Sequence, residues 1–284
     1  MIAVTGATGN VGQPLVRALA AAGEPVRALS RRAPAQGELP TGVRHMRVDL
    51  TAPEELRVAL DGAEALFLLP AGDLLAPGGR PYDLVDAAKA AGVRRIVLLS
   101  SQAAGTRPHA VSHEPLRVFE AAVRESGVDW TVLRCGGFAS NAFAWAESVR
   151  TAHTVAAPFA DVALPVVDPA DIAGAAAVVL RDDLRVHAGR TYELTGPAPV
   201  SPREQAAAIG EALGTPLHFV ELSRDEARSG MLRFMPEAVA DGTLDILGEP
   251  LAEERRVGPD AEGLLGRPAQ PFAAWAARNA AAFR

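Results

Sequence analysis

Three glycines with a spacing of three residues stand near the start of the chain, at positions 6, 9 and 12. They separate an apolar run, residues 1–4, from a segment with helical periodicity, residues 11–22. A strand, a tight turn and a helix start let backbone N–H groups approach a pyrophosphate, whose negative charge the helix N-terminus favours. The turn therefore predicts a dinucleotide site that uses Gly6, Thr8, Gly9, Asn10, Val11 and Gly12.

Two arginines follow the next predicted strand, which covers residues 25–29. In an NAD site an acidic side chain near this position binds the ribose 2′-hydroxyl group, and this position carries no acid. Guanidinium groups instead suit a 2′-phosphate through charge-assisted hydrogen bonds, although a solvated charge pair is the alternative interpretation. Arg31 and Arg32 therefore predict NADPH as the cofactor, with weaker binding of NADH.

Strand and helix patterns alternate through the first half of the chain. Strands are expected at 42–48, 63–69, 94–99 and 129–134, and helices at 53–60, 82–91 and 116–125. This alternation predicts an α/β fold with a Rossmann-type doubly wound parallel sheet. The ligand of such a sheet lies outside the carboxyl ends of the strands, so we expect the loop 70–81 to border the nicotinamide. Further cofactor-binding residues are then expected at the strand ends, namely Asp49, Leu50, Leu69, Pro70 and Ser100.

The second half of the sequence is less regular. Helices and strands are expected at 139–149, 168–180, 190–194, 217–221 and 272–283, with a capping box at Ser201. We expect a cofactor-binding core and a smaller C-terminal substrate lobe. The core comprises residues 1–137 and 168–194, and the lobe comprises residues 138–167 and 195–284.

The composition argues against several classes of protein. A net charge of −6 disfavours nucleic-acid binding, and a single cysteine, Cys135, rules out an internal disulfide and fits a reducing compartment. No apolar run approaches the roughly 18 residues of a membrane helix, and no signal peptide precedes the first strand, so we expect a cytoplasmic protein without a membrane partner. His109 and His113 have a metal-compatible spacing, but Pro108 and Pro115 disfavour the helix that this spacing requires, so we expect no metal.

Several segments together resemble a known family. They are residues 4–12, 30–32, 91–101, 127–134, 192–197 and 264–268. Over nearly its whole length the chain is similar to the NmrA-like branch of the atypical short-chain dehydrogenase/reductase superfamily. The resemblance implies a Rossmann domain, NADP(H) and a small C-terminal substrate lobe. Members of the family include quinone and triphenylmethane reductases, enzymes of secondary metabolism, and redox-sensing regulators that bind the cofactor without chemistry.

The chain departs from the superfamily at the usual proton donor. Most short-chain reductases use a Tyr-x-x-x-Lys pair, but the only tyrosines are Tyr82 and Tyr192 and the only lysine is Lys89. NmrA-like reductases often have a His-x-x-x-Glu pattern instead. Glu120 matches its acid, whereas Leu116 stands where the histidine would be.

Three routes could supply the missing proton. Ser101 and Gln102 end the strand at 94–99 and could polarise a carbonyl group, and His113 titrates in a suitable range, although an ordinary loop histidine is the alternative. We take Ser101 and His113 as the catalytic candidates. The favoured route needs no protein acid, because a phenol next to the substrate ketone would already activate the carbonyl by an internal hydrogen bond.

We therefore expect an NADPH-dependent ketoreductase acting on an aromatic polyketide intermediate in antibiotic biosynthesis. An NADP-sensing regulator without turnover and an NADPH quinone reductase are the alternatives. An aromatic ketone would need a flat apolar pocket, although each of its candidate residues could equally belong to the core. The residues expected to bind the substrate are Gln102, Phe138, Asn141, Phe143, Trp145, Met231 and Phe234.

Overall fold

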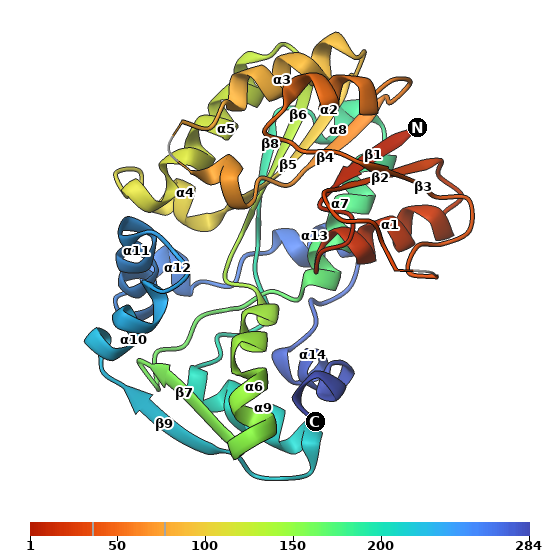
Figure 1. The fold of residues 1–284 in the computed structure, drawn as a ribbon. Coiled ribbons are helices and arrows are strands. Elements are labelled where there is room, and N and C mark those ends of the chain that lie inside the picture. Colours follow the sequence, from red (N-terminus) through yellow and green to blue (C-terminus); the bar gives the residue numbers. More distant parts are fainter. Residues whose placement is uncertain (36, 77) are drawn as a thin grey trace.

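The computed structural model describes residues 1–35, 37–76 and 78–284. Within these residues, seven parallel strands form one sheet in the order β3-β2-β1-β4-β5-β6-β8 (Figure 1). The order changes direction between β1 and β4, which is the switch point of a doubly wound fold. The predicted fold class is therefore confirmed. The strands are β1 (Ile2–Thr5), β2 (Val26–Ser30), β3 (Arg44–Arg47), β4 (Ala65–Leu68), β5 (Arg95–Ser101), β6 (Asp129–Cys135) and β8 (Arg190–Leu194).

The central strands are apolar on both sides because helices cover both faces of the sheet. Successive residues of β5 alternate between two buried clusters, with Val97 and Leu99 in one and Ile96 and Leu98 in the other. The first cluster includes α1 (Gly12–Ala21) and α7 (Pro169–Arg181). The second includes α2 (Pro53–Ala59), α3 (Pro81–Ala90) and α5 (Glu114–Glu125).

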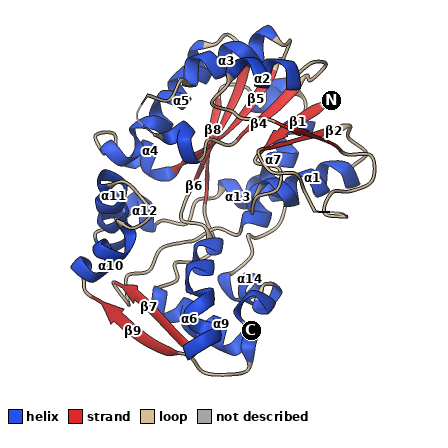
Figure 2. Cartoon of the chain, in the orientation of Figure 1, coloured by secondary structure: helices blue, strands red, loops and turns tan. Residues whose placement is uncertain are grey.

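A third apolar cluster lies apart from the sheet, among the elements in the lower part of Figure 2. Its buried members include Val149, Ile209 and Trp275. Here β7 (Thr154–Pro158) pairs in parallel with β9 (His218–Leu222). The surrounding elements are η3 (Ala139–Trp145), α6 (Ala146–Ala152), α9 (Pro202–Leu213), α14 (Phe272–Arg278) and η4 (Ala280–Phe283).

Further helices complete the fold. Three helices form one group on the left of Figure 1, next to α4 (Gln102–Thr106), and they are α10 (Arg224–Met231), α11 (Glu237–Gly248) and α12 (Ala252–Arg255). The others are η1 (Gly72–Leu75), η2 (Val111–His113), α8 (Leu184–His187) and α13 (Asp260–Leu265).

Several elements differ from the sequence-based expectations. The segment expected as a helix over 139–149 begins as a 3₁₀ turn, and β7, α11, α12 and α13 were not predicted. In α11 the glycines at 242 and 248 resemble helix breakers, but both are needed for close packing. A Cβ atom on Gly242 would lie 2.7 Å from Cβ of Ser112, and one on Gly248 would lie 2.6 Å from the ring of Phe159. Although the expected lobe includes α13, this helix packs against α7 and β8 of the sheet.

Candidate active site

The glycine turn lies between β1 and α1, at the switch point of the sheet. Gly6 has a φ of +62°, which side chains other than glycine rarely adopt. A Cβ atom on Gly12 would lie 2.7 Å from the carbonyl carbon of Gly6 and 2.8 Å from Cα of Ala7, so glycine is required where α1 meets the turn. Among the described residues, no side chain caps α1, and the N–H of Gln13 donates to the carbonyl oxygen of Gly9 at 3.0 Å, which leaves the N–H groups of Val11 and Gly12 for a ligand. The turn therefore fits a bound dinucleotide pyrophosphate.

Thr5 holds the turn against the strand on the other side of the switch point. Its Oγ1 donates to the carbonyl oxygen of Phe67 at 3.0 Å and accepts the N–H of Leu69 at 2.8 Å. The Thr5 side chain is fully buried, so water does not compete for these hydrogen bonds. The ends of β1 and β4 are thus held in register beside the glycine turn.

A cleft with a volume of about 320 Å³ extends along the carboxyl ends of β1 to β4. Three predicted cofactor-binding residues do not line this cleft. Gly12 packs beneath the glycine turn, and Pro70 and Ser100 are buried. The cleft brings together the other predicted cofactor-binding residues: Gly6, Thr8, Gly9, Asn10, Val11, Arg31, Arg32, Asp49, Leu50 and Leu69.

The two arginines lie at one end of this cleft. Nη1 of Arg31 is 3.6 Å from Oδ2 of Asp73, and both side chains are well exposed. An exposed pair of this kind contributes little energy, so the guanidinium stays available to a phosphate group. At the nearby end of β3, the N–H and hydroxyl of Thr51 donate to Asp49 and hold the pKa of that carboxyl below its usual value. The site therefore combines cations with an ionised hydrogen-bond acceptor.

The loop after β4 lies differently from the prediction. We expected residues 70–81 to border the nicotinamide, but Asp73 reaches Arg31, on the β2 side of the switch point. Gly72 has a φ of +59° and turns the chain toward this side, where a Cβ on it would lie 3.7 Å from Nη2 of Arg31. Leu69 and Ala71 still line the cleft. Pro77 lies outside the described residues.

The polar residues at the end of β5 have separate hydrogen-bond partners. Ser100 is buried and donates to Glu120 at 2.7 Å, and Arg134 pairs with the same carboxylate. Burial alone would raise the pKa of Glu120, but the hydrogen bonds from Arg134 and Ser100 lower it. Ser101 is half-buried and accepts the N–H of Ala103 at 3.3 Å, which caps α4. Gln102 donates to a backbone carbonyl of α12 at 3.2 Å.

His113 lies in η2, against α11. Its Nδ1 is 2.9 Å from the hydroxyl oxygen of Ser112. Burial lowers the pKa of His113, and the nearby Arg117 and Arg107 lower it further, while Glu254 acts in the opposite direction. The imidazole is therefore mainly neutral near pH 7, which makes it a weak proton donor.

The predicted substrate-binding residues are not brought together. Phe138 lines the cofactor cleft, whereas Phe143 packs on Trp275 and Phe283 in the core of the lower cluster. Trp145 packs against the same cluster. Asn141 is exposed, Met231 is half-buried at the end of α10, and Phe234 beyond it is 74% exposed.

Some cleft residues were missed from the sequence. They lie at the ends of β2 and β3 and in the loop after β4. Because ligands bind at the carboxyl ends of parallel strands, the residues at the ends of β2 and β3 could have been predicted in the same way as Leu69. These residues are Leu29, Ser30, Val48, Thr51, Ala71, Asp73 and Leu74. In contrast, Cys135 is fully buried, and burial raises the pKa of its thiol, so it is not a nucleophile.

Comparison with known proteins agrees with the geometry of the cleft. Residues 6–183 match the family model described as NAD(P)H-binding. The chain belongs to this family. The match confirms NAD(P)H as the cofactor. The solved structures also confirm the NmrA-like fold that is expected from the sequence.

Three relatives illustrate the range of the family. The chain is 39% identical to a (4-alkanoyl-5-oxo-2,5-dihydrofuran-3-yl)methyl phosphate reductase of Streptomyces griseus, over 100% of this chain and 99% of the relative. It is 26% identical to the NADPH-dependent quinone oxidoreductase 2 of Escherichia coli, solved with NADPH, with a TM-score of 0.81 over 98% and 99% of the two chains. NmrA, a negative transcriptional regulator solved with NADP, shares the fold at 22% identity and a TM-score of 0.76, over 97% and 94%. The chain is thus an NAD(P)H oxidoreductase by relationship.

Two further observations concern the described residues alone. Of the helices they form, none is long and apolar enough to cross a membrane. Within residues 1–35, 37–76 and 78–284, no three His, Cys, Asp or Glu side chains form a group that could hold a metal ion.

Proposed function

We propose that this chain is an NADPH-dependent reductase of conjugated carbonyl compounds, either quinones or α,β-unsaturated carbonyls. The observation that carries the proposal is the position of its only tyrosines and its only lysine. Tyr82 donates to Glu125 at 2.9 Å on the surface, and the Tyr192 hydroxyl lies 2.8 Å from Nδ1 of His187. Lys89 donates to a backbone carbonyl at the end of α5. As far as the described residues define the cleft, none of the three lines it.

The acceptor must therefore be one that needs little protein acid. Hydride addition to an isolated ketone produces an alkoxide, a strong base that usually requires a tuned donor. Addition to a quinone or an unsaturated carbonyl instead produces a phenolate or enolate, whose delocalised charge water can neutralise. When bound, NADPH supplies the hydride. The chain would orient the acceptor, and the Ser101 hydroxyl, which accepts the N–H of Ala103, keeps its own proton for an acceptor oxygen.

The relatives support the same class of acceptor. The Streptomyces griseus enzyme is named for a dihydrofuranone whose ring double bond is conjugated with its carbonyl group. The Escherichia coli enzyme is named for quinones, which are also conjugated acceptors. A common requirement for conjugation would explain how this site could function without a Tyr-x-x-x-Lys pair.

The aromatic polyketide ketone expected from the sequence is a second candidate, supported by the same observation. A phenol beside such a ketone would hold and share its proton, so the product would not be a free alkoxide. The narrower resemblance to the angucyclinone ketoreductase of the simocyclinone pathway leads to this candidate. It predicts that methylation of the neighbouring phenol abolishes turnover, whereas a quinone needs no phenol.

The test is the oxidation of NADPH by each acceptor in the presence of the purified protein, measured by absorbance under anaerobic conditions. The acceptors are 1,4-naphthoquinone, an unsaturated lactone with a phosphate group, a simple saturated ketone, and a phenol-bearing aromatic ketone with its methyl ether as the control. We expect turnover of the first two and slow or no turnover of a simple saturated ketone. Tight NADPH binding with no oxidation by any acceptor would refute the proposal and favour a cofactor-sensing regulator like NmrA.

A further inference from the structure

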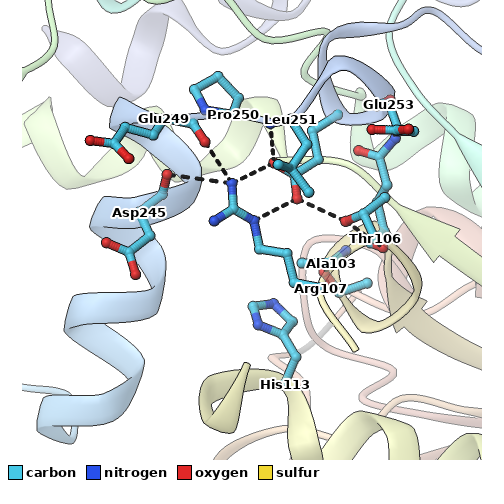
Figure 3. A network of polar contacts seen from close by, with 12 residues as sticks. Ala103, Thr106, Arg107, His113, Asp245, Glu249, Pro250, Leu251 and Glu253 are labelled. Atoms are coloured by element: carbon cyan, nitrogen blue, oxygen red, sulfur yellow. Dashed lines mark hydrogen bonds and ion pairs between the residues drawn. The ribbon is translucent and has the colours of Figure 1, made fainter. Parts of the chain in front are cut away.

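Arg107 joins three elements beside the carboxyl end of β5 (Figure 3). It follows α4 directly, and its Nε and Nη2 donate to the two carboxylate oxygens of Glu254, each at 2.8 Å. The same Nη2 donates to the carbonyl oxygen of Glu249 at 2.8 Å and lies 3.5 Å from that of Asp245. The Arg107 side chain thus connects the end of α4 both to the C-terminal end of α11 and to α12. A cation at the carbonyl end of a helix is also favoured by the helix dipole.

Glu254 is held equally firmly. It is 2% exposed, and its carboxylate also accepts the hydroxyl of Thr106 at 2.8 Å and the N–H of Leu251 at 2.9 Å. Burial alone would raise the pKa of Glu254, but the hydrogen bonds from Arg107 and from the Leu251 backbone lower it. The carboxylate is therefore ionised at neutral pH, and removing its partner would leave a buried charge unpaired.

The segment that Arg107 holds is also bonded to the expected substrate side of the site. Gln102, which directly follows β5, donates to the carbonyl oxygen of Glu253 at 3.2 Å. A Cβ atom on Gly136, which directly follows β6, would lie 3.8 Å from Oε1 of Gln102. The segment 249–255 is therefore bonded at the carboxyl end of β5, where the same Gln102 side chain also approaches the carboxyl end of β6. These ends are on the opposite side of the switch point from Arg31, where the nicotinamide half of a bound dinucleotide meets its substrate.

We propose that Arg107 is a positioning residue that, with Glu254, holds α11 and α12 as one wall of the acceptor site. The inference rests on the proposed function, because the wall matters to an acceptor that binds beside it. Arg107 acts through the segment 249–255 and does not itself touch the acceptor. Its loss should weaken acceptor binding while the cofactor cleft, which β1 to β4 form, keeps its affinity.

The experiment measures binding without turnover, using 1,4-naphthoquinone and the complex of the protein with NADP⁺. Arg107→Met should weaken naphthoquinone binding about ten-fold, within the range for residues that act indirectly on a site, and change NADP⁺ affinity by less than about two-fold. Arg107→Lys should restore part of the loss because it keeps the charge. Amide hydrogen exchange should become faster across residues 237–255 in Arg107→Met.

Arg267→Met is the matched control. Arg267 also pairs with a buried carboxylate, that of Asp171 at 2.7 Å, but it joins the C-terminal segment to α7 rather than to the end of β5. This variant should bind naphthoquinone like the wild type.

Unchanged naphthoquinone affinity or unchanged exchange over 237–255 in Arg107→Met would overturn the positioning role. An equal loss of affinity in Arg267→Met would overturn it as well. Binding of naphthoquinone by the wild type without its reduction would count against the proposed function alone, because the affinities of the variants would still decide the role of Arg107. Normal reduction by Arg107→Met would refute the positioning role and leave the proposed function standing.

Discussion

Replacing Gly12 with alanine should disturb both the fold and cofactor binding. The new Cβ atom would stand 2.7 Å from the carbonyl carbon of Gly6 and 2.8 Å from Cα of Ala7, where ordinary contact begins at 3.4 Å. These neighbours are backbone atoms, so α1 and the turn must move apart by roughly 1 Å, and such overpacking typically costs about 1–3 kcal/mol. For a chain of this size the expected fall in melting temperature is about 2–5 °C. The same shift moves the N–H groups of the turn away from a pyrophosphate, and losing one charged hydrogen bond would weaken NADPH binding about 10–100-fold.

The assay combines thermal unfolding with titration of NADPH fluorescence. Gly263→Ala is the control, because Gly263 lies in α13, has an ordinary φ, and has open space around the position of a Cβ atom. This substitution should leave NADPH affinity unchanged and stabilise the protein slightly, since alanine favours helices. If Gly12→Ala matched the wild type in both melting temperature and affinity, the close approach of α1 to the turn could not be the reason for this glycine.

Two further predictions concern charge. Arg31→Ala and Arg32→Ala should each reduce the preference for NADPH over NADH, measured as the ratio of the two dissociation constants, and the double variant should reduce it most. An unchanged ratio would contradict the assignment of these arginines to the 2′-phosphate. Glu120→Gln should lower the free energy of unfolding at pH 7 by about 2 kcal/mol or more, measured with urea. Because the folded pKa of Glu120 lies below its ordinary value, this contribution is complete above about pH 5 and disappears as pH falls through the folded pKa, so the wild-type and variant curves should converge in acid. Curves that stay parallel at low pH would contradict this prediction.

The cofactor half of the site was largely predictable because its signals are local. The glycine spacing, the strand before it and the helix after it lie within the first 22 residues, and Arg31 follows the next strand directly. Parallel strands place their carboxyl ends at one edge, so Leu69 could be assigned to that edge from strand order alone. The path of the loop after β4 was not predictable, since it depends on the turn at Gly72 and the contact of Asp73 with Arg31.

The substrate half was not predictable because its signals are not local. Phe143 and Phe138 are five residues apart and equally apolar, yet one packs in the lower core and the other lines the cleft. The pattern of glycines hid α11, whose Gly242 is explained only by the approach of Ser112, more than a hundred residues earlier. Composition cannot distinguish a pocket aromatic from a core aromatic, because burial favours both.

The sequence by itself determined a Rossmann-type sheet, a nicotinamide dinucleotide and the absence of a Tyr-x-x-x-Lys pair, since each follows from residue identity and short spacing. Tertiary structure alone decided which polar groups face each other across long separations. It pairs Arg107 with Glu254, 147 residues apart, and commits Ser100 to Glu120 instead of the cleft. Such pairs depend on how helices dock onto strand ends, and docking is determined by the packing of whole faces rather than by any short motif.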